Sequence, residues 1–145
     1  MQTNLHPIFK NTAVGDEAEA ILRSCVHCGF CNATCPTYQE LGDERDGPRG
    51  RIYLIKQLLE TGEATEKTRT HMDRCLTCRS CETTCPSGVE YGRLADIGKE
   101  IIERQQTRPF AEQIMRWGLR HILPYRQRFT ALFRLGQWLR PLMPA

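Results

Sequence analysis

The segment CVHCGFCNATCP at residues 25–36 recurs fifty residues later as CLTCRSCETTCP at residues 75–86. Both segments space their cysteines as C-x2-C-x2-C-x3-C and place a proline directly after the last one. Both also carry a threonine one residue before that last cysteine. The two segments contain all eight cysteines of the 145-residue chain, which indicates that one four-cysteine unit has been duplicated within it.

Three kinds of cysteine chemistry compete for this pattern. Disulfides require an oxidising compartment, and the first twenty residues lack the apolar segment of a secretory signal. Zinc sites typically use C-x2-C pairs with four ligands per ion, which leaves the third and fourth cysteines of this spacing without a role. The observed spacing is instead the one found at [4Fe–4S] clusters, where the fourth cysteine binds the other cluster of a pair. The sequence therefore predicts two [4Fe–4S] clusters.

The shape of a cubane cluster explains the spacing. Three closely spaced thiolates in one loop can reach three iron corners of one cube, whereas the fourth corner points away from that loop. In a duplicated unit, the partner motif supplies the fourth thiolate. We therefore expect one cluster at Cys25, Cys28, Cys31 and Cys85, and the other at Cys75, Cys78, Cys81 and Cys35.

The residues around the motifs predict helices. Ile52, Ile55 and Leu59 recur at helical spacing, with Leu58 beside them, in a segment over about 46–60. Asp46 is the expected N-cap, Pro48 falls in the first turn and Gly62 is the expected stop. Two further helices are expected over residues 16–24 and 66–74. Another is expected to begin at a capping box from Ser87 to Glu90 and to end at about Gln105. Its apolar face would consist of Leu94, Ile97, Ile101 and Ile102. No segment alternates with period two. We predict an all-α, α-helical ferredoxin-type domain over residues 1–106.

The composition changes at Thr107. Residues 107–145 contain seven arginines and one acidic residue, so this tail carries a formal charge of +6 against −3 for residues 1–106. Two amphipathic helices are expected, 109–123 and 125–139, separated at Pro124. We expect their apolar faces to pack on this domain or on a neighbouring one. Peripheral contact with anionic lipid is the next alternative, and no nucleic acid is expected as a partner.

Charged residues near the motifs give further expectations. Arg74 and Arg79 flank the expected second cluster, which predicts a higher reduction potential for it than for the first cluster. Arg49, Arg51 and Lys56 are expected on a solvated helix face, with a docking patch as the alternative. His27 and His71 are expected beside a cluster or facing solvent rather than as ligands.

With these motifs in view, the chain resembles the iron–sulfur subunit of bacterial glycolate oxidase (glycolate dehydrogenase). The resemblance rests on CVHCGFCNATCPTY at 25–38, LGDERDGPRGRIYLIK at 41–56 and RCLTCRSCETTCPSG at 74–88. It implies an α-helical ferredoxin fold and an oxidoreductase subunit for electron transport. In this family a separate flavin subunit oxidises glycolate to glyoxylate, and the clusters pass the electrons toward an acceptor such as a quinone.

The residues agree with a relay that lacks its own substrate chemistry. Neither a G-x-G-x-x-G nor a G-x-x-x-x-G-K-[ST] phosphate-binding motif occurs, and no catalytic residue is predicted. The alternatives are the electron-transfer subunit of a related glycerol-3-phosphate or lactate dehydrogenase, and a cluster-based redox or iron sensor. The expected location is the cytoplasm, with peripheral attachment to the cytoplasmic face of the inner membrane as the alternative. The resemblance departs after Cys85, since the family's CCG repeats are missing and a truncated product or a fragment is expected.

Overall fold

The computed structural model describes residues 1–139, and every regular element in that range is a helix. The chain divides into two compact units, Met1–Gln106 and Thr107–Ala145, the second described as far as Leu139. The first unit contains the α-helices α1 (Ala13–Ser24), α2 (Pro36–Leu41), α3 (Pro48–Thr61), α4 (Glu66–Asp73), α5 (Ser80–Thr83) and α6 (Tyr91–Gln105), with the 3-10 helices η1 (Phe30–Thr34) and η2 (Glu44–Asp46). The all-α prediction is confirmed.

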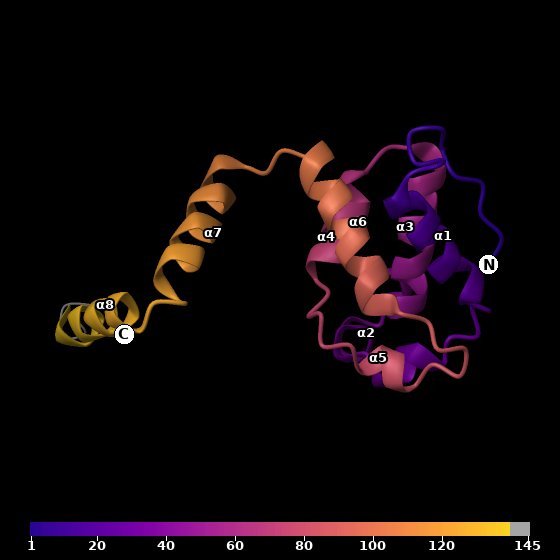
Figure 1. Ribbon diagram of the computed structural model, residues 1–145. Coiled ribbons are helices and arrows are strands. Elements are labelled where there is room, and N and C mark those ends of the chain that lie inside the picture. The colour runs from indigo at the N-terminus through magenta and orange to yellow at the C-terminus, as the bar shows by residue number, and fades with distance from the viewer. Residues whose placement is uncertain (140–145) are drawn as a thin grey trace. The chain divides into compact units, whose positions relative to one another are not determined.

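Helices α1, α3, α4 and α6 pack against one another and enclose the core of the first unit (Figure 1). Helices α3 and α6 approach closely, because a Cβ atom at Gly98 would lie 2.9 Å from Cγ1 of Ile55. Ile101 is only partly buried against this core. The other apolar positions predicted for the two helices are at most 3% exposed: Ile52, Ile55, Leu58, Leu59, Leu94, Ile97 and Ile102.

The helices begin differently from the predictions. Helix α1 starts one turn earlier than expected because the Thr12 hydroxyl accepts a hydrogen bond from Gly15 N. Helix α3 has Pro48 in its first turn and ends at Gly62, as predicted, but its N-cap is Gly47. The prediction of Asp46 as the cap is wrong, because its carboxylate is buried and bound to His71 and Arg74 instead.

The predicted capping box at the start of α6 is also wrong. The helix starts at Tyr91, and Ser87 lies in a turn with Gly88 at a positive φ of 61°. The Glu82 carboxylate accepts a hydrogen bond of 2.5 Å from Gly92 N. A side chain of α5 therefore binds one of the first backbone amides of α6, which have no partner within their own helix. The end at Gln105 agrees with the prediction.

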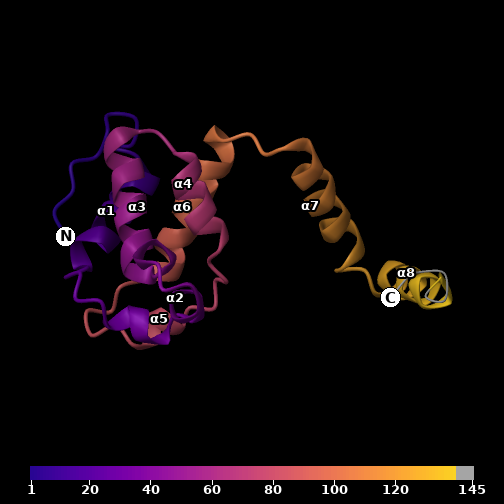
Figure 2. The same ribbon diagram turned by 180° about the vertical axis from the view of Figure 1, so that it is seen from behind.

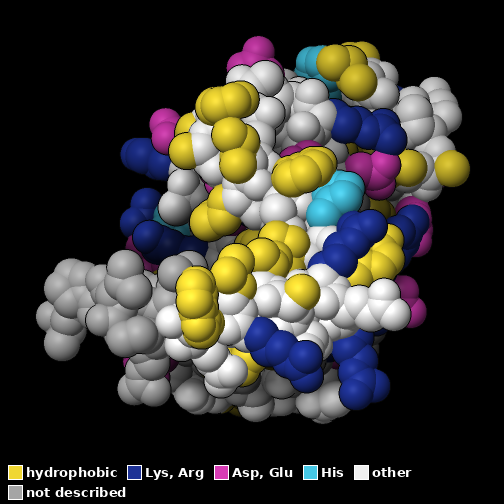
Figure 3. Space-filling view, turned by 90° about the vertical axis from the view of Figure 1, so that its left-hand side faces the viewer, with side chains coloured by type: hydrophobic (Ala, Val, Ile, Leu, Met, Phe, Trp, Pro, Cys, Tyr) yellow, Lys and Arg dark blue, Asp and Glu magenta, His cyan; other side chains and the backbone are white. Residues whose placement is uncertain are grey.

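The second unit contains α7 (Phe110–Ile122) and α8 (Arg126–Leu139), which contact each other. Their bounds confirm the two helices predicted on either side of Pro124. No residue between 107 and 138 is buried, and the packing of these apolar faces on this domain or on a neighbouring one stays a prediction. Figure 3 shows hydrophobic side chains beside Lys and Arg on one face of the molecule. Within residues 1–139, no helix has the length and apolar character needed to cross a bilayer.

Candidate metal centres

The two cysteine motifs meet at one end of the helical bundle, where α2 and α5 lie (Figures 1 and 2). Elements η1 and α5, which belong to the first and the second motif, contact each other. The equivalent threonines of the two motifs meet there, with Oγ1 of Thr84 3.3 Å from Oγ1 of Thr34. The duplicated sequence segments are therefore neighbours in space.

Both motif loops have the same backbone pattern. In each loop, the residue directly before the second cysteine adopts a positive φ, at His27 (60°) and Thr77 (53°). The residue after the second cysteine does so too, at Gly29 (87°) and Arg79 (59°). Left-handed backbone is costly for residues other than glycine. Its recurrence at equivalent positions shows that each loop curls tightly around the space between its cysteines.

The first pocket contains about 420 Å³ of empty space, part of which is open to solvent. Cysteines of both motifs line it: Cys25, Cys28, Cys31, Cys81 and Cys85. Burial raises the pKa of the Cys31 thiol, and the neighbouring thiols of Cys25, Cys85 and Cys28 raise it further. Four of the five thiols are those predicted together for the first cluster.

The second pocket measures about 290 Å³ and is lined by Cys35, Cys75, Cys78 and Cys81. These are the four cysteines predicted for the second cluster. Burial raises the pKa of the Cys81 thiol to about 12, with additional effects from the thiols of Cys31, Cys75 and Cys35. Cys81 lines both pockets, so the two spaces adjoin.

Arg51 is the most deeply buried cation beside the second pocket. Its side chain is 1% exposed and lines this pocket. The guanidinium donates from Nε to the carbonyl oxygen of His71 (2.8 Å) and from Nη1 and Nη2 to Oγ1 of Thr37 (3.1 Å each). Nη1 also lies 3.8 Å from Sγ of Cys35. The expectation that Arg51 lies on a solvated face is therefore wrong.

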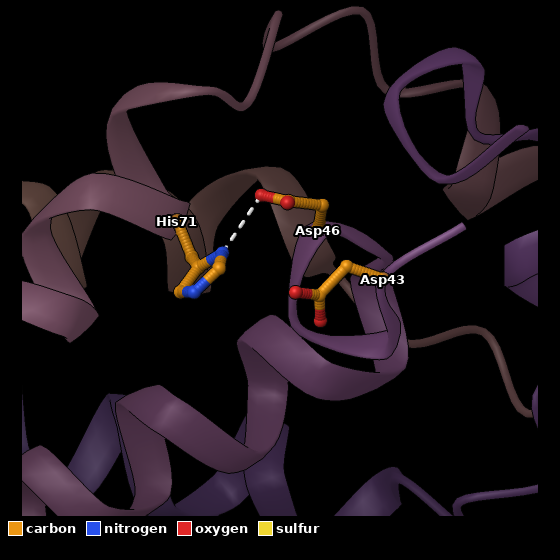
Figure 4. Close-up of side chains that lie close together, drawn as sticks. All are labelled: Asp43, Asp46 and His71. Carbon is orange, nitrogen blue, oxygen red and sulfur yellow. Dashed lines mark hydrogen bonds and ion pairs between the residues drawn. The ribbon is translucent and has the colours of Figure 1, made fainter. Parts of the chain in front are cut away.

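Asp46 is the carboxylate that faces this arginine. One of its oxygens lies 2.9 Å from Nδ1 of His71 and 3.6 Å from Nη2 of Arg51, and the other accepts a 2.8 Å hydrogen bond from Nη1 of Arg74. Figure 4 shows the His71 ring turned toward Asp46, with Asp43 nearby. Because basic groups already occupy both Asp46 oxygens, this cluster is an ion-pair network and not a cation site.

Tyr91 and His27 provide two further polar groups near the cysteines. The hydroxyl of Tyr91 lies 3.4 Å from Sγ of Cys75, and burial, followed by the effect of Cys75, holds the pKa of Tyr91 well above its usual value. Tyr91 therefore stays neutral and can donate to a Cys75 thiolate. His27 lines the first pocket, and its buried Nδ1 has no hydrogen-bond partner among the described residues.

The charges near the second pocket differ from the sequence expectation. Arg79 lines this pocket as predicted, whereas Arg74 is directed to Asp46. The first pocket is not free of cations, because Arg49 lines it, but Arg49 donates to Glu44, which compensates its charge.

Sequence reasoning missed the contacts of Arg51, Asp46, Thr37 and Tyr91. Helical spacing from Ile55 and Leu58 was the signal that places Arg51 on the buried face of α3.

The two pockets fit anionic iron–sulfur clusters. The first brings five cysteines and the second four around one space, in each case from both motifs, and soft thiolates are the ligands that iron–sulfur clusters require. The second pocket also adjoins a buried guanidinium whose carboxylate is shared with Arg74 and His71. A buried positive charge is costly unless it is compensated, and a negatively charged cluster would supply that compensation.

Residues 21–89 match the family model of the 4Fe–4S dicluster domain. The cofactors are accordingly two [4Fe–4S] clusters. In sequence, the chain is similar to the glycolate oxidase iron–sulfur subunit of Escherichia coli (strain K12), with 60% identity over 99% of the chain and 35% of that relative. It is also 39% identical to a probable glycolate oxidase iron–sulfur subunit of Bacillus subtilis (strain 168), over 83% of the chain and 27% of the relative.

The chain spans about a third of the length of these curated relatives. No solved structure matches the chain at a significant level.

Proposed function

We propose that this chain is the electron-relay part of a glycolate oxidase iron–sulfur subunit. The single observation that carries the proposal is the pair of adjoining thiol pockets, each lined by cysteines of both motifs. When bound, [4Fe–4S] clusters supply one-electron transfer. The protein residues hold the two redox centres close together, shield them from water and set their potentials.

The proposed ligands are those expected from the duplicated spacing. They are Cys25, Cys28, Cys31 and Cys85 for the first cluster, and Cys35, Cys75, Cys78 and Cys81 for the second. The lining of the pockets supports this division, with Cys81 as the one thiol that borders both. We assign Cys81 to the second cluster because the motif spacing groups it with Cys75 and Cys78.

The partner chemistry follows from the two similar relatives, which are named as subunits of glycolate oxidase. We propose that a separate flavin subunit oxidises glycolate to glyoxylate and passes electrons singly to this chain. An acceptor such as a quinone then receives them from the clusters. The alternatives are a related lactate or glycerol-3-phosphate dehydrogenase, and a redox or iron sensor.

An anaerobic electron-transfer assay separates these alternatives. The full chain is mixed with a candidate flavin subunit, and loss of the visible cluster absorbance is followed after addition of glycolate, lactate or glycerol 3-phosphate. Glycolate is expected to reduce the clusters only when the flavin subunit is present. Reduction by another substrate alone would favour a related dehydrogenase, and the absence of reduction with every substrate would favour a sensor.

We further propose a cytoplasmic location with peripheral contact at the inner membrane. The tail supports this, since α7 and α8 expose large apolar residues such as Phe110 and Trp117 on a segment of charge +6. Co-sedimentation of the full chain with vesicles of anionic and of neutral lipid tests this contact. Binding to the anionic vesicles that weakens with added salt is expected, and equal sedimentation with and without vesicles would contradict it.

A further inference from the structure

Arg51 combines near-complete burial with proximity to a predicted cluster ligand. Only 1% of its side chain is exposed, and Nη1 lies 3.8 Å from Sγ of Cys35. The hydroxyl of Thr37 holds the guanidinium in place by accepting from both Nη atoms, and the His71 carbonyl accepts from Nε. The guanidinium is therefore held inside the protein by three hydrogen bonds to two partners.

The charge of Arg51 is incompletely compensated within the protein. Its carboxylate partner Asp46 lies 3.6 Å away and binds Arg74 and His71 at shorter distances. Two guanidinium groups thus share one buried carboxylate, which leaves excess positive charge beside the second pocket. In a buried environment such a charge acts more strongly than it would in water.

The chemistry of a thiolate ligand defines which neighbours can act on it. A thiolate has no proton, so Cys35 can only accept hydrogen bonds when it binds iron. One donor, Nη1 of Arg51, faces its sulfur at 3.8 Å, because the Thr37 hydroxyl, although 3.2 Å away, donates its proton to the carbonyl oxygen of Asp46. At another cysteine of this pocket, the Tyr91 hydroxyl lies 3.4 Å from Sγ of Cys75.

The first pocket has a different electrostatic environment. Its arginine, Arg49, is about one-third exposed and has Glu44 as a direct carboxylate partner. The sulfur of Cys85 is reached by the backbone amide of Val89 at 3.5 Å. The positive charge at this pocket is thus matched one to one, unlike the charge at the second pocket.

We propose that Arg51 is the positioning residue that sets the reduction potential of the second cluster above that of the first. The inference rests on the proposed function and names a determinant of it. Reduction adds one electron to the cluster, and hydrogen bonds to a ligand sulfur together with nearby positive charge stabilise the reduced form. The second cluster therefore holds the electron first when the chain is partly reduced.

The test is a redox titration of the anaerobically purified full chain, followed by EPR, with wild type and Arg51→Met compared. At a fixed potential, Arg51→Met is expected to lower the reduced-to-oxidised ratio of one cluster by roughly tenfold, equivalent to about 59 mV for one electron. The cluster affected is identified as the one whose signal Cys78→Ser alters. The signal altered by Cys28→Ser is expected to keep its potential.

Two further variants keep the test decisive. Arg51→Lys retains the charge but loses the planar contacts, so its potential is expected between those of wild type and Arg51→Met. Lys56→Met is the matched control, because it removes another cation of helix α3. The partner of Lys56 is Glu60, whose side chain is partly exposed. This control is expected to leave both potentials unchanged.

Each outcome has a defined meaning. Unchanged potentials in Arg51→Met at full cluster content, or a shift confined to the signal that Cys28→Ser alters, would overturn the proposal. If Arg51→Met loses its clusters, Arg51→Lys decides: a lowered potential of the second cluster supports the proposal and an unaltered one overturns it. A wild-type chain without iron and sulfide would instead refute the proposed function itself.

Discussion

At Asp46, one buried carboxylate serves three basic groups. The oxygens of this side chain, which is fully buried, face His71, Arg51 and Arg74. Removing one partner from a buried network leaves the others uncompensated, and this costs more than loss of a surface ion pair. The network connects η2, α3 and α4 at the second pocket, so its integrity bears on both stability and potential.

We predict that Asp46→Asn destabilises the protein by about 3–5 kcal/mol, because Arg51 would lose its charged partner in the interior. The unfolding temperature of the holo protein, followed by far-UV circular dichroism, is expected to fall by roughly 10 °C or more. Asp43→Asn is the control, since Asp43 pairs with the half-exposed Arg45. Equal effects of the two substitutions would contradict the role of the network.

A second residue-scale prediction concerns the backbone of the second motif. Thr77 adopts a φ of 53°, which is costly for a β-branched residue. Thr77→Gly is expected to stabilise the holo protein by roughly 1 kcal/mol by relieving this cost, measured as a rise in unfolding temperature. Thr83→Gly in α5 is the control and is expected to be destabilising, because glycine is unfavourable within a helix. A lower unfolding temperature for Thr77→Gly would argue against the strained loop.

At the scale of single elements, α6 depends on a residue outside itself. The Glu82 carboxylate accepts from Gly92 N and satisfies one of the free amides at the start of the helix. It therefore joins α5, which carries Cys81 of the second motif, to the helix that carries Tyr91.

We predict that Glu82→Ala costs about 0.5–2 kcal/mol, in the range of other lost helix caps. The unfolding temperature of the holo chain provides the measurement. Ser87→Ala is expected to have little effect, because Ser87 lies before the helix begins at Tyr91. A larger loss from Ser87→Ala than from Glu82→Ala would restore the capping box suggested by sequence.

Most helices were predictable from sequence because their apolar spacing and their stop signals are local. Helix α3 shows this, with Pro48 at its start and Gly62 at its end. The N-terminal contacts were not predictable, since Glu82 and Asp46 act on partners distant in sequence. The four cysteines that the duplicated spacing groups for the second cluster line the second pocket, whereas the first pocket is lined by its own four and by Cys81 as well. The surroundings of those cysteines depend on packing that no spacing encodes.

For the whole molecule, we expect the two clusters to contribute to folding as well as to the proposed electron transfer. The cysteine end of the first unit contains two pockets instead of a filled core. Metal ligation contributes to the stability of small domains, because the ligands are brought together only in the folded state.

We predict that complete removal of the clusters by a chelator and an oxidant abolishes cooperative thermal unfolding of the chain. Near-UV and far-UV circular dichroism of the apo and holo forms provide the comparison. Anaerobic reconstitution with iron and sulfide is expected to restore the transition. A cooperative transition at the holo temperature in a metal-free sample would contradict this coupling.

The central claim is that each cluster takes its fourth ligand from the opposite motif, and EPR of single cysteine variants tests it most directly. Cys35→Ser is compared with Cys28→Ser, from the same motif, and with Cys78→Ser, from the other motif. The account predicts that Cys35→Ser alters the same cluster signal as Cys78→Ser and leaves unchanged the signal that Cys28→Ser alters. If Cys35→Ser and Cys28→Ser altered the same signal, the exchange of ligands between the motifs would be contradicted.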